Sequence, residues 1–486
     1  MTKRMPRILL AAPASGSGKT LITCGILQAL VNRGLQVASF KCGPDYIDPM
    51  FHGRVIGTKS RNLDTFFTDE NTTRYLFLKN TEDCEIAVAE GVMGYYDGLG
   101  GVRTEGSTYE VACVLDLPTV LIVPCRGASL SILATVKGFL EYRNDSHIRA
   151  VILNQISPMI YAQLKPLLEQ ELGVRVLGYV PKLTDLNLES RHLGLVLPGE
   201  IAALKEKLNR LAEKLEETLD LDALLALAEE SGELSADRPQ IPMIHASLQY
   251  KKTNILEKKP EAEADMRELS ASANSDFDLR IAVAEDDAFC FTYLDNLELL
   301  REMGAELVPF SPLKDRSLPE HISGLILSGG YPELHAEELS GNESMRAAIR
   351  SALENEMPCI AECGGFLYLH RELEGDDGKF YPMAGAFDAR AYRTDRLGRF
   401  GYINLCARED GLLGPAGTTL RGHEFHYWES ERCGEAFHAK KPVGKREWDC
   451  VIGGERLYAG FPHLFLWSNP EAAYSFLKKC GEYALC

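Results

Sequence analysis

The sequence contains no uninterrupted apolar run of about 18 residues, which is the length that a membrane-spanning helix needs. We therefore expect no membrane span and no membrane partner. The apolar part of the N-terminal stretch, MTKRMPRILLAAP, is too short for a secretory signal peptide and leads directly into a Gly/Ser-rich loop. Both absences favour a cytoplasmic protein.

The chain also lacks a C-x-x-C pair and an excess of positive charge. Its 13 cysteines are scattered and odd in number, which is typical of reduced thiols in the cytosol, one of which can be reactive. The formal net charge of −18 argues against a nucleic-acid partner. An acidic substrate would therefore have to be held by local lysines, arginines or a metal ion.

The length of 486 residues suggests two or three domains of about 100–200 residues each. Residues 232–276 mix Ser, Glu, Asp, Lys and Pro with little periodicity, and we find no internal repeat. We predict one domain over 1–235, a linker over 236–276 and a second domain over 277–486. Residues 200–230 have the pattern of amphipathic helix with a solvated face.

Residues 7–20, RILLAAPASGSGKT, have the pattern of a phosphate-binding loop. A short apolar strand precedes a small-residue loop, and the apolar spacing that follows is helical. The loop N–H groups and the helix N-terminus favour anions. Pro13 stands where the usual motif has Gly. The residues that we predict to bind nucleotide are Ser15, Gly16, Ser17, Gly18, Lys19 and Thr20, with Lys19 on the β/γ-phosphates and Thr20 on Mg²⁺.

Three acidic residues lie at or shortly after the carboxyl ends of the next two expected strands. Asp45 and Asp48 lie after 36–40, and Glu90 ends the apolar strand 85–90. Such positions suit ligands of Mg²⁺, and we predict Thr20, Asp45 and Glu90 as the metal ligands. The alternative is that Asp45 and Asp48 only form a turn and that Glu90 is a surface acid. Prolines 44 and 49 indicate a fixed loop at 44–49 and not a helix.

Further apolar strands at 119–124, 150–154 and 174–180 alternate with helical stretches. This alternation predicts right-handed βαβ crossovers and a mostly parallel sheet, with ligands beyond the carboxyl ends of its strands. Asn154 ends one of these strands and is a candidate for the nucleotide pocket.

A second α/β unit begins at 279–284, and its short strand 358–361 runs into ECGGF. Cys363 lies between a strand and a helix among small residues, as in a nucleophile elbow, where a helix N-terminus favours the thiolate. The alternative is a buried structural cysteine. The N–H groups of Gly364 and of the Gly329–Gly330 loop are candidates for an oxyanion hole, and we select Gly330 and Gly364.

A catalytic thiolate needs a base. His463 follows the strand-like stretch LYAGFPH about 100 residues after Cys363, which suits a Cys–His pair assembled by the fold. His423 and His426, in RGHEFHYW, are alternatives.

Seven motifs together resemble the cobyrinic acid a,c-diamide synthase family over essentially the whole chain. They are AAPASGSGKT (11–20), FKCGPDYIDPMFH (40–52), EGVMGYYDG (90–98), LSGGYPE (327–333), AECGGFLYL (361–369), GHEFHY (422–427) and the His463 segment. The resemblance implies two α/β domains: an N-terminal P-loop NTPase domain like dethiobiotin synthetase, and a C-terminal class I glutamine amidotransferase domain.

This resemblance implies an ATP- and Mg²⁺-dependent ligase. Cys363 and His463 would release ammonia from glutamine, and the first domain would activate carboxylates of a tetrapyrrole, cobyrinic acid, as acyl phosphates. Tyr46, Asp48 and Asp97 match loops that face the tetrapyrrole. The glutamate that classical amidotransferases carry two residues after the histidine is Phe465 here, so the residue that orients His463 is open.

Three alternatives remain. The same chemistry on nickel-sirohydrochlorin fits the motifs equally well. A P-loop ATPase switch with an interaction module has no use for the ECGG elbow, and a stand-alone glutaminase with a regulatory nucleotide domain would not couple ATP to a tetrapyrrole. The sequence leaves the oligomeric state open, a homodimer included.

Overall fold

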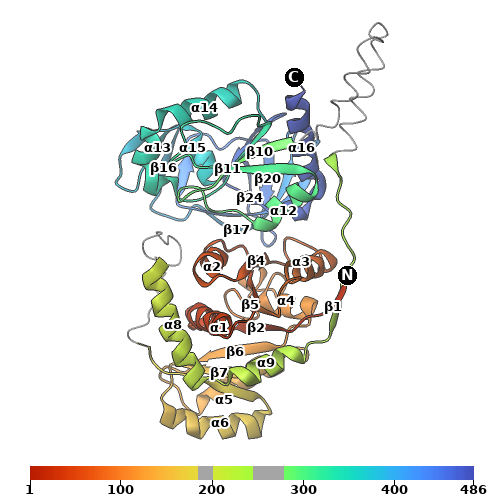
Figure 1. Ribbon diagram of the computed structural model, residues 1–486, viewed down its shortest axis with the longest axis vertical. Coiled ribbons are helices and arrows are strands. Elements are labelled where there is room, and N and C mark those ends of the chain that lie inside the picture. Colours follow the sequence, from red (N-terminus) through yellow and green to blue (C-terminus); the bar gives the residue numbers. More distant parts are fainter. Residues whose placement is uncertain (184–200, 245–278, 486) are drawn as a thin grey trace. The chain divides into compact units, whose positions relative to one another are not determined.

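The computed structural model describes residues 1–183, 201–244 and 279–485. The chain divides into two compact units, Met1–Pro239 and Gln240–Cys486 (Figure 1). Of the predicted linker, residues 245–276 lie outside the described residues. Ala236 exchanges hydrogen bonds with Met1 in the first unit, and Ile244 donates to the carbonyl of Met303 in the second. No helix of the described residues is long and apolar enough to cross a membrane.

The first unit is built on a seven-stranded parallel sheet. Its strands are, in spatial order, β4 (Lys59–Leu63), β3 (Val37–Cys42), β5 (Ile86–Glu90), β2 (Arg7–Ala11), β6 (Thr119–Pro124), β7 (Ile148–Asn154) and β8 (Arg175–Val180). Every residue of β2, β3 and β5 is buried, as expected of central strands covered on both faces. The predicted parallel α/β architecture is thereby confirmed.

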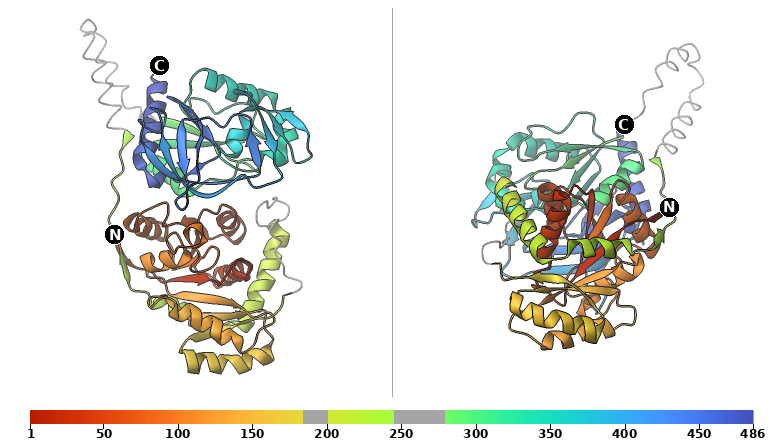
Figure 2. Two further views of the ribbon diagram at one scale, coloured as in Figure 1. Left: turned by 180° about the vertical axis from the view of Figure 1, so that it is seen from behind. Right: turned by 60° about the horizontal axis from the view of Figure 1, so that its bottom comes forward.

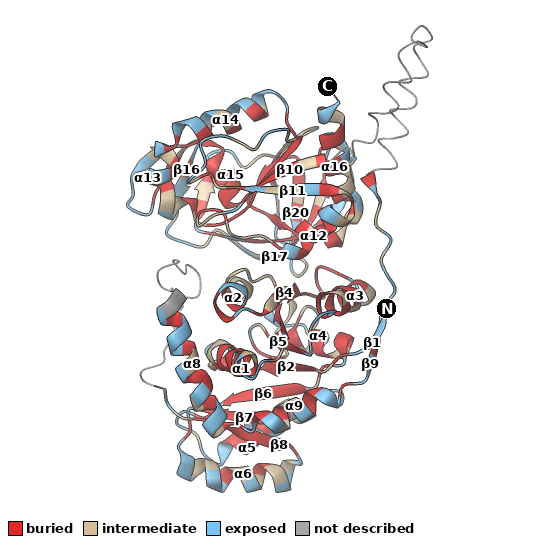
Figure 3. Cartoon of the chain, in the orientation of Figure 1, coloured by how far each residue is buried: buried red, intermediate tan, exposed pale blue. Residues whose placement is uncertain are grey.

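Helices cover this sheet. They are α1 (Lys19–Asn32), α3 (Glu70–Asn80), α4 (Thr108–Leu115), α5 (Ser131–Glu141), α6 (Pro158–Leu172), α8 (Ile201–Thr218) and α9 (Leu221–Glu229), with the 3₁₀ turn η2 (Leu99–Gly101) before α4. Figure 2 shows α8 beside α1, and Leu208, Leu211 and Leu215 of α8 are buried in the core that they share. The opposite face of α8 is exposed (Figure 3), as the amphipathic pattern predicts. Strands β1 (Thr2–Arg4) and β9 (Glu233–Ser235) form a two-stranded antiparallel sheet, which pairs the first residues of the unit with residues near its last.

The prediction of a fixed loop at 44–49 is wrong. Residues 47–51 form the short helix α2 (Ile47–Phe51), which continues into the π-helical turn η1 (His52–Ile56). Pro49 is tolerated because it lies in the first turn, where backbone N–H groups lack helical acceptors in any case. The side chain of Asp45 starts the helix, since its Oδ1 accepts from the N–H groups of Ile47 (2.9 Å) and Asp48 (3.1 Å).

The second unit has a central six-stranded sheet. Its spatial order is β11 (Ala305–Phe310), β10 (Leu279–Ala284), β12 (Gly324–Leu327), β13 (Cys359–Glu362), β23 (Leu457–Gly460) and β22 (Ile452–Gly454), all parallel except β22. Its helices are α12 (Leu294–Glu302), α13 (Ala336–Gly341), α14 (Glu343–Glu354), α15 (Gly364–Tyr368) and α16 (Pro470–Ala484), with the 3₁₀ turns η3 (Pro332–His335) and η4 (Leu466–Ser468).

Two smaller sheets complete this unit. One has the order β15 (Phe380–Pro382), β14 (His370–Glu374), β16 (Phe387–Arg393) and β19 (Trp428–Ser430). The other is antiparallel, with the order β21 (Glu447–Cys450), β20 (Phe437–Lys440), β17 (Arg399–Ala407), β18 (Thr419–His426) and β24 (His463–Leu464). The antiparallel sheet places β24 beside β18.

Candidate active sites

In the first unit, the loop between β2 and α1 has the conformation of a phosphate cradle. Gly16 (φ 78°) and Gly18 (φ 84°) adopt left-handed backbone conformations, and Gly18 caps the N-terminus of α1. Ser15 and Gly16 are exposed. Asn154, at the end of β7, donates from its side-chain amide to the carbonyl of Ser17 (2.8 Å). A Cβ on Gly18 would lie 2.4 Å from the same amide nitrogen, so only glycine fits between loop and strand.

Lys19 is held beside the loop. Its Nζ donates to the carbonyl of Met93 (2.9 Å), a non-glycine residue with φ 50°. Burial, followed by repulsion from Lys41, lowers the pKa of Lys19 to about 8. A phosphate would therefore offer this lysine a stronger partner than the neutral carbonyl that it has.

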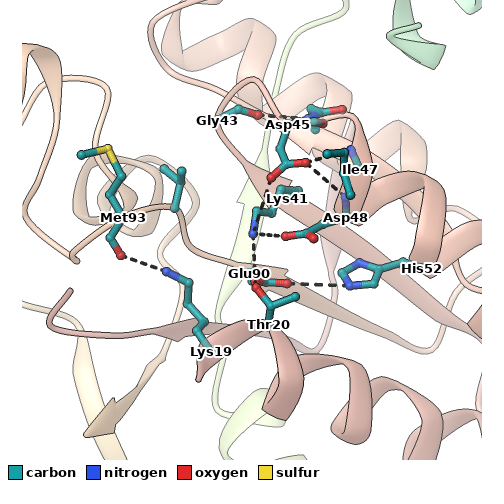
Figure 4. Close-up of polar contacts among 12 residues, drawn as sticks. Lys19, Thr20, Lys41, Gly43, Asp45, Ile47, Asp48, His52, Glu90 and Met93 are labelled. Atoms are coloured by element: carbon teal, nitrogen blue, oxygen red, sulfur yellow. Dashed lines mark hydrogen bonds and ion pairs between the residues drawn. The ribbon is translucent and has the colours of Figure 1, made fainter. Parts of the chain in front are cut away.

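Lys41 lies at the centre of a cluster of acids (Figure 4). No role was predicted for this lysine from the sequence. Its ammonium is within 2.8 Å of Glu90 Oε1, contacts Asp48 directly, and is 4.0 Å from Asp45 Oδ2. Burial opposes its charge, but the carboxylates of Glu90 and Asp48 raise the pKa of Lys41 well above its usual value. The cation thus allows these acids to lie together in a buried site.

The acids of this cluster differ in ionisation. Burial disfavours the charge of Glu90, but the ammonium of Lys41 and the hydroxyl of Thr20, which donates to Oε1 (2.7 Å), lower its pKa. Burial and the charge of Glu90 raise the pKa of Asp48 to about 7. His52, whose Nε2 is 3.7 Å from Glu90 Oε2, has a pKa lowered to about 4 by burial and is neutral.

The donor set fits Mg²⁺ when the ion arrives with a nucleotide. The described residues contain no group of three or more His, Cys, Asp or Glu side chains arranged around one metal position. Mg²⁺ is usually held by one or two protein oxygens together with phosphates and water. Thr20 Oγ1 and Glu90 converge, and Glu90 Oε2 is buried without a hydrogen-bond partner among the described residues.

The residues predicted to face the substrate lie on the loops around this cluster. Tyr46 is half-buried and directly precedes α2. Asp97 is half-buried, and its Oδ2 accepts from the N–H of Gly94 (3.0 Å), so it also shapes the loop after β5. Asp48 is buried against Lys41 and not exposed on the loop.

In the second unit, Cys363 has the geometry of a nucleophile elbow. It joins β13 to α15 with φ 45° and ψ −102°, an unfavourable backbone conformation for a side chain larger than hydrogen. Its N–H donates to the carbonyl of Gly460 on β23 (2.8 Å), which fixes the turn. A Cβ on Gly364 would lie 2.9 Å from the amide nitrogen of Gly330, so the two predicted oxyanion donors are side by side.

His463 is the histidine that the structure brings to Cys363. It lies on β24, 2% exposed, and its ring is so close to Gly329 that a Cβ there would be 2.3 Å from Cε1. Burial alone would lower its pKa. The charge of Cys363 and a hydrogen bond with it, together with Glu362, instead raise the pKa of His463 to about 10. The arrangement favours an imidazolium–thiolate pair.

The alternative histidines lie on the neighbouring strand β18. His423 is opposite His463 in the β18–β24 register, and burial lowers its pKa to about 3. His426 donates from Nδ1 to the carbonyl of Trp428 (2.6 Å), and its ring stacks on Phe461 at 3.8 Å. These contacts give His426 a structural role, because they pack its ring against Phe461, two residues before His463.

Comparison with known proteins agrees with this division. Residues 8–196 match the CobQ/CobB/MinD/ParA nucleotide binding domain, and residues 280–471 match the CobB/CobQ-like glutamine amidotransferase domain. The chain is 35% identical to a cobyrinate a,c-diamide synthase of Caldanaerobacter subterraneus, over 98% of both chains. It is 38% identical to one of Listeria innocua, over 96% of this chain and 97% of the relative.

Both predicted modules, the nucleotide-binding domain and the glutamine amidotransferase domain, are thereby confirmed. A similar protein of Clostridium acetobutylicum is 37% identical over 96% of this chain and 98% of its own length, and it has the same name. The three matches cover 96–98% of this chain and 97–98% of the relatives. The chain belongs to the cobyrinate a,c-diamide synthase family.

Proposed function

We propose that this protein amidates the a and c acetate carboxylates of cobyrinic acid, using ATP and glutamine. The observation that carries the proposal is the match over 96–98% of the chain, at 35–38% identity, to relatives named cobyrinate a,c-diamide synthase. The two sites support it because each half of the chain has the groups for one half of this reaction. The many thiols favour the reducing cytoplasm as its location.

The second unit would supply ammonia. The thiolate of Cys363 attacks the side-chain amide carbon of glutamine, and the N–H groups of Gly330 and Gly364 stabilise the developing oxyanion. His463 gives its proton to the departing nitrogen, so the C–N bond breaks and ammonia leaves. Water then hydrolyses the thioester to glutamate and restores Cys363, with His463 as the base.

The first unit would activate the acceptor. A carboxylate oxygen of the tetrapyrrole attacks the γ-phosphorus of ATP, and the bond to ADP breaks. The loop Ser15–Thr20, with Lys19, holds the phosphates, and Asn154 keeps the loop in place. Thr20, Glu90 and Asp45 would hold Mg²⁺, which adds positive charge beside the phosphates. Ammonia then attacks the acyl carbon and phosphate leaves, which gives the amide.

Tyr46, Asp48 and Asp97 are the residues that we assign to the tetrapyrrole side of this site. Tyr46 and Asp97 are half-buried on loops beside the carboxylate cluster. Asp48, with its pKa raised to about 7, exists partly as a neutral acid at physiological pH. A neutral Asp48 can donate a hydrogen bond to a substrate carboxylate, which an ionised one cannot.

The test is to incubate the purified chain with ATP, Mg²⁺ and glutamine, and with either cobyrinic acid or nickel-sirohydrochlorin, while product mass and phosphate release are followed. We expect two amides on cobyrinic acid and two phosphates per molecule. Amidation of the nickel ring in preference to cobyrinic acid would overturn the choice of substrate. ATP hydrolysis that is independent of both rings would overturn the ligase assignment.

A further inference from the structure

His463 needs a group that holds its ring, and the usual position for one is occupied by a hydrophobic residue. Two residues after His463, Phe465 is 3% exposed and packs edge-on against Tyr293 at a centroid distance of 5.2 Å. Phenylalanine cannot accept a hydrogen bond from an imidazole. The orienting group must therefore come from elsewhere in the unit.

Glu362 lies where such a group is needed. It is the last residue of β13 and directly precedes Cys363. Its Oε2 is 3.6 Å from Nδ1 of His463, and its Oε1 accepts from the backbone N–H of Leu464 (3.1 Å). One carboxylate thus contacts both the imidazole and the backbone of the residue that follows it.

The backbone around His463 is fixed on its other side as well. Asn296, on α12, donates to the carbonyl of Leu464 (2.7 Å) and accepts from the N–H of Leu466 (2.8 Å). These bonds hold the backbone that follows His463. Contact of Nδ1 with Glu362 restricts that ring to the orientation in which Nε2 is available to the thiol.

From this geometry we propose that Glu362 is the positioning residue of the glutamine site, the third member of a Cys363–His463–Glu362 triad. This inference rests on the proposed glutaminase role of Cys363. Glu362 keeps the proton of His463 on Nδ1 and stabilises the imidazolium that forms when Nε2 accepts the thiol proton.

The adjacency of Glu362 and Cys363 has a structural consequence. Both are fixed by the pairing of β13 with β23, in which Glu362 lies opposite Gly460 and Cys363 donates to the same residue's carbonyl. The nucleophile and the carboxylate therefore share one rigid strand end. Only His463 comes from a distant part of the sequence.

Four titratable side chains interact with the charge of His463: Cys363, Glu362, His423 and His426. Cys363 and Glu362 favour the imidazolium, and the buried neighbours His423 and His426 on β18 have pKa values lowered to about 3 and 4. Both neighbours are neutral near pH 7. Glu362 is thus the acid among these groups.

The test compares Glu362→Gln, Glu362→Ala and Glu362→Asp in the full chain, with Glu374→Gln as the matched control. Glu374 is also a half-buried glutamate, and its Oε2 accepts a backbone N–H (Arg393, 2.9 Å), but it has no hydrogen bond or ion pair with a histidine among the residues that the structure describes. We expect Glu362→Gln to lower kcat for glutamine hydrolysis by about 10²-fold or more, with KM for glutamine changed less than about threefold. Glu362→Asp should recover part of kcat, and Glu374→Gln should match the wild type.

A second readout separates positioning from mere folding. The rate of Cys363 alkylation by iodoacetamide, measured against pH, reports the imidazolium–thiolate pair without any substrate. In Glu362→Gln its alkaline limb should move to lower pH, while amidation supported by ammonium chloride is unchanged. Wild-type kcat and an unshifted alkylation profile in Glu362→Gln would overturn the inference. Failure of wild-type amidation even with ammonium would instead reject the proposed function.

Discussion

Lys41 is the residue on which the carboxylate cluster of the first unit depends. Glu90 is fully buried and Asp48 nearly so, and the ammonium of Lys41 contacts both. Removing one partner of a buried ion pair leaves the other charge unpaired, which costs about 3–5 kcal/mol. We expect Lys41→Met to lose that much free energy of unfolding and to lose amidation with either nitrogen source.

The measurement for Lys41→Met is urea unfolding followed by circular dichroism. Tryptophan fluorescence would miss it, because Trp428, Trp448 and Trp467 all lie in the second unit. Lys165→Met is the control, since Lys165 forms a half-exposed pair with Glu169, and such pairs contribute less than about 1 kcal/mol. Equal stability losses in the two variants would contradict the assignment.

Glu424 makes the stability of the second unit depend on pH. It is fully buried on β18, and neither carboxylate oxygen has a hydrogen-bonding partner of good geometry among the described residues. Burial raises its pKa to about 7, against the opposing charges of Arg399 and Lys441. Since the folded state then binds a proton more tightly than the unfolded state, this residue makes stability fall as pH rises from about 4.5 to 7.

We expect Glu424→Gln to remove that part of the pH dependence. A shift of this size corresponds to a free energy on the order of 3 kcal/mol, so the variant should gain stability over the wild type at pH 7.5 and not at pH 4.5. Tryptophan fluorescence during urea unfolding reports this unit selectively. A constant difference between the two proteins across this pH range would contradict a buried acid with a raised pKa.

At the scale of elements, continuous apolar runs were predictable and half-buried strands were not. β6 (119–124) and β10 (279–284) have the predicted bounds, because their residues are almost all apolar. The strands between 370 and 454 were not anticipated, whereas β23 (457–460) lies in the stretch predicted as strand-like. In β17, buried Ile403, Leu405 and Ala407 alternate with polar or exposed residues, and charged ends obscure this period of two. The alternation is the signal that would have located this strand.

The helix α2 depends on a side chain outside it. Asp45 supplies the first two amides of α2 with an acceptor and is also a proposed metal ligand. The two roles separate by substitution. Asp45→Ala should cost about 1 kcal/mol of stability and also activity, while Asp45→Asn, which keeps an acceptor, should keep stability and still lower amidation.

Asp220 offers a matched control for that experiment. Its Oδ1 accepts from the N–H of Ala223 at the start of α9, far along the chain from the acidic cluster. Asp220→Ala should lose similar stability by thermal unfolding and keep wild-type amidation. If Asp45→Asn amidates at the wild-type rate, the carboxylate charge has no part in the reaction and Asp45 is only a helix cap.

At the scale of the whole molecule, the sequence located the residues that belong to local motifs. The phosphate loop, Glu90 and Cys363 each lie at a strand end that the pattern marks. The contacts of Lys41 and Glu362 were not predictable, since each depends on side chains from distant strands: Glu90 for Lys41 and His463 for Glu362. The choice of His463 over His423 likewise needed the register of β24 against β18.

The division of labour between the two units gives a prediction for the whole chain. Cys363→Ala should lower glutamine-dependent amidation by about 10³-fold or more, because no other thiol lies at the elbow. The same variant should amidate with ammonium chloride at raised pH, where more of the nitrogen is uncharged ammonia, at a rate near that of the wild type. Lys19→Ala, which removes the cation of the phosphate loop, should lose amidation with both nitrogen sources.

Product mass with each nitrogen source distinguishes the outcomes, and glutamate release measures the glutaminase step by itself. Lys19→Ala should still contain an intact Cys363–His463 pair, so its thiol should remain open to alkylation at the wild-type rate. A Cys363→Ala protein that is inactive with ammonium as well would mean that the thiol serves both half-reactions. The assignment of acceptor activation to the first unit would then be wrong.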